Sequence, residues 1–402
     1  MKKDELMKLV EKHAEHTIAL RRDIHAHPEL SEHEERTSKL VQEELKRLGI
    51  PYETYDGYTA VVGLIHGAGE GPVIGLRADM DALPILEERT ELPFCSQNDG
   101  VMHACGHDVH TSTLLGAAAV LKDLAPKLNG TVKLLFQPAE EAGNKGASYF
   151  IKQGCLENPK VDKIFAFHVD ASKEWGTLGT RVGAYNAASD KFYVTVLGKS
   201  SHGTKPELGI DALYVACQIV LAVYSMMGRR INGLDKVSIN VGKLHGGNTH
   251  NIVCDRAEFV ISLRTVDKRM REFMHQEIRA LIEGIAAANR AKLEINEVYG
   301  CSSVMNEEAS VELIHGVSDW LLGKDAYIPN PDPIMGSEDF SAYGDAGVPG
   351  AMYDLGVRNT EKGMTAPIHN SMFCPDERAI PIGMAMQAGI VYKLLSAEGL
   401  EE

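Results

Sequence analysis

Hydrophobic residues recur along the first half of the chain with two different spacings. A spacing typical of amphipathic helices predicts helices at residues 4–22, 32–48, 109–124 and 145–153. Short, continuous apolar runs between these helices predict strands at about 60–66, 72–78, 131–137 and 163–168. Because strands that alternate with helices are typical of α/β folds, we expect a mostly parallel sheet with helices on both faces.

The second of these helices carries a start signal and a stop signal. Ser31 and Glu34 have the spacing of a capping box, in which the serine bonds to the first turn of the helix. Gly49 is expected to end the same helix, since glycine readily adopts the left-handed conformation found after helix ends.

The pattern changes near residue 187. Six segments then follow in the order strand, helix, strand, strand, helix, strand, at 190–198, 208–228, 236–245, 255–266, 268–289 and 291–299. This is the order of the split ferredoxin-like unit, which indicates a complete α+β domain inserted into the first one.

The chain returns to helices after the inserted segment. We expect helices at 309–323 and 377–398, flanking a stretch at 331–373 whose Gly, Pro and Asp content is typical of loops around a site. The sequence therefore predicts a discontinuous catalytic domain, residues 1–186 and 300–402, interrupted by an inserted domain at 187–299.

Composition and charge narrow the class of protein. The 402 residues exceed the usual size of a single core, and the 44% hydrophobic and 24% charged content is ordinary for a globular protein. A formal net charge of −15 argues against a nucleic-acid partner. The sequence has no signal-peptide pattern and no apolar run long enough to span a membrane. Its seven cysteines do not suggest a disulfide framework. We therefore expect the chain to be cytoplasmic.

Side chains that commonly bind metal ions are concentrated in three short stretches, residues 102–108, 137–141 and 165–168. Cys105 and His107 are two positions apart, so in extended backbone both leave the same face and can converge on one ion. Glu140 and Glu141 are neighbours, which in extended backbone point to opposite sides. One can then bind metal while the other takes a proton from the attacking water. The pattern predicts a two-metal hydrolytic site.

Two of these stretches follow directly on expected strands. The strand at 131–136 ends at the glutamate pair, and the strand at 163–167 ends at His168. Open α/β sheets bind their ligands at the carboxyl ends of the strands, so we expect these groups to lie close together. His369, within the loop-rich stretch, is a further candidate ligand because the other four are present.

Several ordered motifs give the chain a specific resemblance. They lie at residues 21–31, 76–84, 102–108, 136–141, 251–255 with Arg264, and 336–340. Over nearly its whole length the chain resembles the dinuclear metallo-amidohydrolases of the aminoacylase and carboxypeptidase superfamily, in the branch of the hippurate hydrolases and plant auxin-conjugate hydrolases. The resemblance implies a catalytic α/β domain and an inserted ferredoxin-like domain that mediates dimerisation and closes as a lid.

The resemblance also implies how two divalent metal ions would be held. Cys105 would bridge them as a thiolate, with His107 and His168 on one ion and Glu141 and His369 on the other. One sulfur, three imidazoles and a carboxylate suit zinc, manganese, nickel or cobalt, so the identity of the metal stays open.

Five further residues have roles implied by the resemblance. Glu140 would be the general base, and Asp81 would orient a metal-binding imidazole. In the inserted domain, His202 and Asn251 would lie near the carbonyl group of the substrate, and His202 would reach it within its own chain or across a dimer. Arg264 would meet a carboxylate of the substrate.

Two places depart from the usual pattern of this family. After His202 the family often reads Ala-Ala-x-Pro-His, whereas residues 203–207 read Gly-Thr-Lys-Pro-Glu. After His168 and Val169, this chain has Asp170 and Ala171 in place of a small or aromatic residue and a proline. These changes line the lid and the pocket rim, so they concern the identity of the substrate rather than the reaction.

We therefore expect a metal-dependent amidohydrolase that cleaves the amide bond of N-acyl amino acids or related small amides, and that forms a homodimer or higher homo-oligomer. A dipeptidase and an aminobenzoyl-glutamate-type hydrolase are alternatives within the same reaction. A cysteine hydrolase with Cys105 as nucleophile would instead be indifferent to chelators. A zinc deaminase would need a Pro-Cys-x-x-Cys segment, which is missing. A catalytically dead ligand-binding homologue is disfavoured because the candidate ligands and the base are all present.

Overall fold

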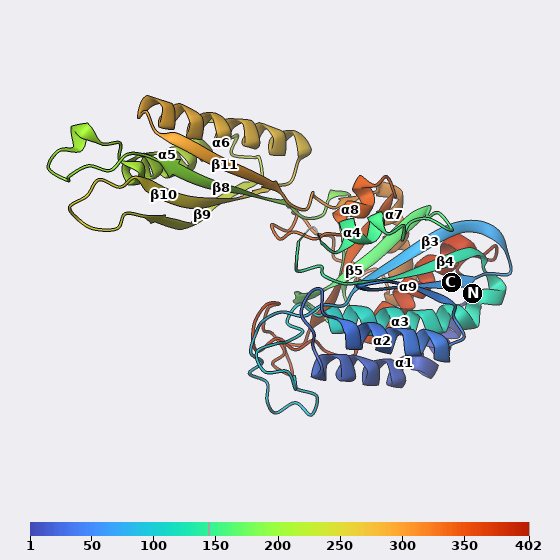
Figure 1. Cartoon of the computed structure of the whole chain (residues 1–402). Coiled ribbons are helices and arrows are strands. Elements are labelled where there is room, and N and C mark those ends of the chain that lie inside the picture. The colour runs from blue at the N-terminus through green and yellow to red at the C-terminus, as the bar shows by residue number, and fades with distance from the viewer. Residues whose placement is uncertain (144, 402) are drawn as a thin grey trace. The chain divides into compact units, whose positions relative to one another are not determined.

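The structure, a computed structural model, describes residues 1–143 and 145–401 and divides into two compact units (Figure 1). The first unit comprises Met1–Tyr185, Val304–Asp332 and Asp339–Glu402, and the second comprises Asn186–Ser303 and Pro333–Glu338. The second unit contains the whole of the expected inserted domain at 187–299 and extends beyond it. The assignment of this unit as a lid stays a prediction.

A seven-stranded sheet forms the centre of the first unit. Its spatial order is β1-β2-β4-β3-β5-β13-β6. The strands are β1 (Tyr52–Tyr55), β2 (Tyr58–His66), β3 (Gly69–Asp79), β4 (Asn129–Gln137), β5 (Lys163–Glu174), β6 (Leu178–Gly179) and β13 (Gly350–Arg358). The four central strands β4, β3, β5 and β13 are parallel to one another. At the edges, β2 pairs antiparallel with β4, β1 with β2, and β6 with β13. The expected α/β fold with a mostly parallel central sheet is confirmed.

Helices cover both faces of this sheet. One face carries α1 (Lys3–Ala26), α2 (Glu35–Arg47), α3 (His107–Leu124), α7 (Glu308–Leu322) and α9 (Ala379–Leu395), and the other carries α4 (Ala147–Lys152) and α8 (Ser341–Asp345) (Figure 1). Along β4, Phe136 packs in the core of the first face and Leu135 in the core of the second. This alternation buries the strands on both sides, which explains their continuous apolar runs.

Short elements complete the first unit. They are the 3-10 turn η1 (Ala125–Lys127) and the two-stranded pairing of β7 (Gly183–Ala184) with β12 (Met305–Asn306). Among residues 1–143 and 145–401, no helix combines the length and the apolar character that crossing a membrane requires.

The second unit is a four-stranded antiparallel sheet with two helices. The strands β8 (Ala188–Leu197), β9 (Val237–Gly246), β10 (Arg256–Thr265) and β11 (Lys292–Tyr299) have the spatial order β11-β8-β10-β9. The helices α5 (Ala212–Met227) and α6 (Lys268–Ala288) pack their apolar faces against the sheet, and η2 (Pro206–Leu208) precedes α5. The chain order is the β-α-β-β-α-β order that the sequence predicts.

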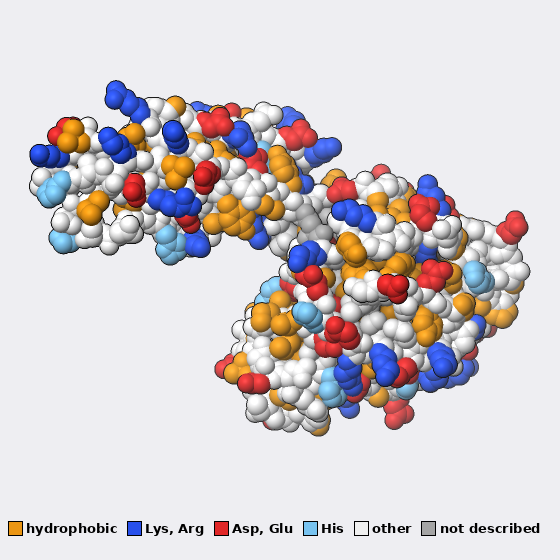
Figure 2. Space-filling model, viewed as in Figure 1, with side chains coloured by type: hydrophobic (Ala, Val, Ile, Leu, Met, Phe, Trp, Pro, Cys, Tyr) orange, Lys and Arg blue, Asp and Glu red, His pale blue; other side chains and the backbone are white. Residues whose placement is uncertain are grey.

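Acidic and basic side chains are interspersed over the visible face of each unit (Figure 2).

Two local predictions are wrong. The stretch 331–373 was expected to be loops, but it contains β13, a strand whose residues 350–357 are all buried in the sheet. Glycines and an aspartate within this run gave it the composition of a loop. The capping box is also wrong, because α2 begins at Glu35 and its first-turn amides at Arg36 and Thr37 bond to the Glu29 carboxylate at 2.9 and 2.8 Å.

Candidate metal centre

Six candidate metal-binding and catalytic side chains converge at the carboxyl end of the parallel strands in the first unit. Glu140 and Glu141 follow the end of β4, and His168 lies within β5. His107 is the first residue of α3, Cys105 precedes it, and His369 lies in the loop between β13 and α9. Segments separated by more than two hundred residues therefore meet at the edge of the sheet where open α/β folds bind ligands.

The donor atoms form two clusters that share one sulfur atom. Donor atoms of Cys105, His107 and His168 lie within 4.8 Å of one another, as do those of Cys105, Glu141 and His369. Cys105 Sγ lies 3.4 Å from His168 Nε2 and 3.3 Å from His369 Nε2, and this imidazole nitrogen is 3.3 Å from Glu141 Oε1. A third cluster joins His107 to both Glu140 and Glu141.

Backbone and carboxylate acceptors orient two of the imidazoles. His107 Nδ1 lies 2.8 Å from the carbonyl oxygen of Asp81 and 3.2 Å from its carboxylate, so Nδ1–H is the donor and Nε2 is left deprotonated in the neutral ring. His168 Nδ1–H donates to the Val169 carbonyl at 2.8 Å, which turns Nε2 toward Cys105. Both rings thus present the nitrogen that a metal ion requires.

The local backbone at the site differs from the extended conformation expected from sequence. Cys105 and His107 do not share one face of a strand, because Gly106 has φ +88° and caps the start of α3. An added Cβ at Gly106 would lie 2.4 Å from Val169 Cγ2, so this turn requires glycine. Glu140 and Glu141 also leave β4 through a turn rather than in extended backbone.

Asp81 connects the imidazole of His107 to the glutamate turn. Its carboxylate accepts hydrogen bonds from the backbone N–H groups of Glu140 at 3.2 Å and Glu141 at 3.0 Å. It also accepts the hydroxyl of Ser31 at 2.6 Å, which is the role this serine has in place of helix capping. Burial opposes ionisation of Asp81, but the hydrogen bonds from His107, Ser31 and the Glu141 amide, together with the charge of His107, outweigh it and lower the pKa of Asp81.

A buried chain of hydrogen bonds behind the site was missed by the sequence analysis. Arg77 Nη1 donates to Asp79 Oδ2 at 2.5 Å, and Asp79 Oδ1 accepts from His110 Nδ1 at 2.6 Å. His110 Nε2 then accepts the backbone N–H of Val169 at 3.0 Å and so fixes the backbone next to His168. The three-residue spacing of His107 and His110 on one helix was a signal that could have indicated this contact.

The charges of the metal-free site favour a thiolate and imidazolium rings. Burial opposes ionisation of Cys105, but the positive charges of His168 and His107 outweigh it and lower the pKa of the thiol to about 6. Hydrogen bonds to Cys105 and Glu141 raise the pKa of His369 to about 10. Protons on the imidazole rings therefore hold the anionic sulfur and carboxylate together where a divalent cation would otherwise do so.

The donor set fits a pair of divalent ions. His107 Nε2 is buried and has no hydrogen-bond partner among the described residues, although it lies beside Cys105 and the glutamate turn. His369 adopts the left-handed backbone conformation with φ +61°, which is uncommon outside glycine and is typical of constrained functional sites. Thiolate, imidazole and carboxylate donors together suit zinc and its first-row neighbours.

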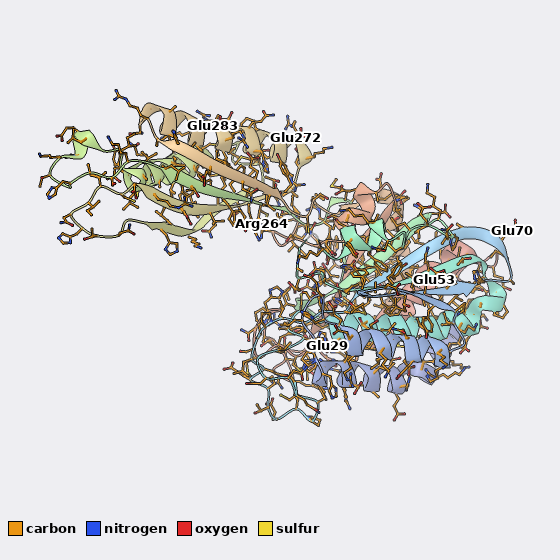
Figure 3. The ribbon with its side chains drawn as sticks, in the orientation of Figure 1. Glu29, Glu53, Glu70, Arg264, Glu272 and Glu283 are labelled. Atoms are coloured by element: carbon orange, nitrogen blue, oxygen red, sulfur yellow. The ribbon has the colours of Figure 1, made fainter. Side chains whose placement is uncertain are left out.

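The other expected site residues belong to the second unit. His202 pairs with Ile252 in an isolated antiparallel bridge, and the N–H of Gly203 donates to the Asn251 carbonyl at 2.7 Å. The structure thus brings the loops of His202 and Asn251 together. Arg264, labelled in Figure 3, lies on β10 and donates to the Ser189 hydroxyl at 2.6 Å (Figure 3). Their contacts with a substrate remain predictions.

An α/β fold with this cluster of thiolate, imidazole and carboxylate donors defines a metal-dependent hydrolase. Residues 75–393 match the model of Peptidase family M20/M25/M40, and the chain belongs to this family.

Individual members of this family are similar to the chain over nearly its whole length. Thermostable carboxypeptidase 1 of Saccharolobus solfataricus is 38% identical, over 94% of either chain. The N-acetyl-L-cysteine deacetylase of Bacillus subtilis is 37% identical, over 90% of this chain and 84% of that protein. The crystal structure of the Bacillus subtilis YXEP protein, a dinuclear metal-binding peptidase of the M20 family, matches with a TM-score of 0.81 and 31% identity and covers 95% of this chain and 98% of that one.

Proposed function

We propose that this protein hydrolyses the amide bond of N-acyl amino acids or closely related small amides with the help of two divalent metal ions. His107 and His168 would hold one ion, Glu141 and His369 the other, and Cys105 both. The observation that carries the proposal is that Cys105 Sγ belongs to both donor clusters. A carboxypeptidase and a deacetylase among the relatives support an amide as the bond that is cleaved.

The residues of the chain divide the work of the reaction. Divalent ions, when bound, supply Lewis-acid chemistry that makes a water molecule easier to deprotonate and polarises a carbonyl group. Glu140 would accept the proton of the attacking water and pass it to the nitrogen of the leaving amine. It is suited to this role because it lies on the same turn as Glu141, within 4.8 Å of donor atoms of His107 and Glu141, but belongs to neither of the two clusters that contain Cys105. His202 would donate a hydrogen bond to the developing oxyanion.

A substrate screen tests the proposed reaction. N-acetyl, N-benzoyl, indole-acetyl and aminobenzoyl-glutamyl amino acids should be compared with dipeptides by kcat/KM on the metal-loaded protein. We expect the highest value for one of the N-acyl amino acids, with a loss of turnover after chelation. A preference for dipeptides or for the aminobenzoyl-glutamyl substrate would move the assignment to one of the alternatives, and no turnover on any amide would favour a ligand-binding role.

Metal binding should release protons and should strengthen as the pH rises. A metal ion requires the neutral imidazole of His369, whose raised pKa of about 10 keeps it protonated near pH 7 in the metal-free protein. Below about pH 6 the thiol of Cys105 must lose a proton as well, so the affinity should fall more steeply there. Calorimetry of zinc binding in buffers with different ionisation enthalpies should show release of roughly one proton or more per chain at pH 7. Binding without proton release would show that His369 is not protonated in the metal-free protein at pH 7.

A homodimer in which the second unit contributes to pairing remains a prediction, as does a cytoplasmic location. Outward-facing apolar side chains on α5 support the dimer, because Tyr214, Leu221 and Tyr224 are 56%, 68% and 42% exposed. If His202 acts across the dimer, the inactive variants Glu140→Ala and His202→Ala should regain part of their activity when they are mixed. One of the sites in a mixed dimer would then hold both intact groups.

The mixing experiment needs two controls. Sedimentation should first show at least a dimer, and each variant should be mixed with itself to measure the background. Recovery should follow the rate at which mass-labelled subunits exchange. If exchange is complete and no activity returns, His202 acts within its own chain or not at all.

A further inference from the structure

Two buried carboxylates hold the turn that carries Glu140. The backbone N–H of Ala139 donates to Glu34 Oε1 at 2.9 Å. The N–H groups of the next two residues, Glu140 and Glu141, donate to the two oxygens of Asp81 at 3.2 and 3.0 Å. Three consecutive amides after β4 are therefore bound by side chains from elsewhere in the fold. One of these side chains, Glu34, has no role in the metal cluster.

The amide that Glu34 binds belongs to a constrained residue. Ala139 is buried and has φ +59°, a left-handed conformation that a non-glycine residue keeps only where its surroundings impose it. The backbone at this position sets the direction in which the following side chains leave the strand. A change of conformation at Ala139 would thus rotate Glu140 away from its present position.

Glu34 is itself held in place from several sides. Its side chain is fully buried at the start of α2. Oε1 also accepts the backbone N–H of Glu32 at 3.0 Å, and Oε2 accepts the hydroxyl of Thr59, at the start of β2, at 2.7 Å. With both oxygens bound to separate elements, the carboxylate cannot follow the turn if the turn moves. It acts as a fixed acceptor to which the turn is attached.

We propose that Glu34 is a positioning residue that sets the orientation of Glu140 through the amide of Ala139. The proposal rests on the function proposed above, in which Glu140 moves the proton. Glu34 touches neither the candidate ligands nor, by these contacts, the substrate. Its effect should therefore appear in the chemical step and not in binding.

The test compares Glu34→Ala with Glu34→Gln at saturating metal concentration, on the best substrate of the screen. Loss of the acceptor in Glu34→Ala should lower kcat by about 10²-fold, since displacing a catalytic group by about 1 Å has this effect, with KM within about twofold of the parent. Glutamine keeps an oxygen for the Ala139 amide, and burial raises the pKa of Glu34 to about 7, so glutamine also resembles the protonated acid. Glu34→Gln should retain kcat within about threefold of the parent.

Glu29→Ala is the matched control. Glu29, labelled in Figure 3, belongs to the same connection between α1 and α2, and its side chain accepts three hydrogen bonds, from the backbone amides of Arg36 and Thr37 and the Thr37 hydroxyl. None of these bonds involves the glutamate turn. This variant should lower the melting temperature but leave kcat unchanged, because Glu34 keeps its own bonds to Ala139 and Thr59 when the side chain of Glu29 is removed.

Three outcomes would overturn the inference. They are a kcat of Glu34→Ala equal to that of the parent, a loss of kcat in Glu34→Gln as large as in Glu34→Ala, and a loss that only follows a loss of bound metal. If Glu34→Ala does not fold, Glu34→Asp replaces it, because the shorter side chain withdraws the acceptor from Ala139; parental kcat in that variant would have the same meaning.

Glu140→Gln separates this inference from the proposed function. If Glu140→Gln turns over like the parent, Glu140 is not the base, and the role of Glu34 fails together with that part of the proposed function. If Glu140→Gln is inactive while Glu34→Ala keeps parental kcat, only the role of Glu34 fails.

Discussion

Replacing Glu140 with glutamine is expected to lower kcat by about 10²- to 10⁴-fold, which corresponds to about 3–5 kcal/mol in the activation free energy. The amide cannot accept the proton of the attacking water, although it has the size of the carboxylate and leaves the turn after β4 in place. Metal content should stay near that of the parent, because Glu140 lies outside the two donor clusters that share Cys105. Steady-state kinetics and elemental analysis on the same preparation measure both quantities.

The neighbouring residue supplies the contrast for this prediction. Glu141→Gln also replaces a carboxylate with an amide on the same turn, but Glu141 belongs to the cluster with Cys105 and His369. We expect this variant to lose bound metal and, as a result, activity. If Glu140→Gln loses metal in the same way, or keeps near-parental kcat, Glu140 is not the base.

Replacing Cys105 with serine should lower metal occupancy and activity together. The sulfur lies 3.4 Å from His168 Nε2 and 3.3 Å from His369 Nε2, so its loss removes a donor from both clusters at once. A serine hydroxyl is not ionised near neutral pH, whereas the lowered pKa of Cys105, about 6, makes the thiol anionic there. We expect residual activity below about 1% of the parent at equal metal concentration, with partial recovery at a large excess of metal.

Cys217→Ser is the control for the cysteine prediction, because this free thiol is exposed on α5 of the second unit. It should keep parental metal content and kcat. Alkylation with iodoacetamide tests the alternative that the protein is a cysteine hydrolase with Cys105 as its nucleophile. A metal-free protein that stays active until Cys105 is alkylated would show that this residue is a nucleophile and not a metal ligand.

The fold could be predicted from sequence wherever the apolar pattern reflects burial. The central parts of β2, β3, β4 and β5 are buried on both faces, so each appears as a mostly apolar run, interrupted by Arg77 in β3 and by Lys133 in β4. The order of strands and helices in the second unit could also be predicted, because the spacing of its hydrophobic residues changes between that of a strand and that of a helix. β13 was missed because Asp354 and the small residues Gly350, Ala351 and Gly356 conceal a strand that parallel pairing with β5 nevertheless buries.

The members of the candidate site could be predicted, whereas their local geometry could not. Cys105, His107, Glu141, His168 and His369 come together, but by a helix start and a turn instead of the extended backbone that spacing rules assume. Turns of this kind depend on contacts between distant segments. The hydrogen bond from Ala139 to Glu34 spans 105 residues, and the bond from Ser31 to Asp81 spans 50.

Supporting residues were missed for a related reason. His110 follows the expected ligand His107 by three residues, but this spacing alone does not show which groups its imidazole binds, because the bonds to Asp79 and Val169 depend on the approach of α3 to β3 and β5. When a residue acts through a backbone amide, as His110 does at Val169, the pattern of side chains does not identify its partner. Such residues become visible only when the acceptor and the amide are placed in space.

Titration of the chelator-stripped protein with zinc or manganese measures whether activity depends on two bound metal ions. Activity and bound metal should be followed together on the best substrate of the screen. We expect an inactive apoprotein whose activity rises with added metal and levels off at about two ions per chain, the number that two clusters sharing one sulfur would hold. Full activity in the stripped protein, before any metal is added, would contradict this expectation.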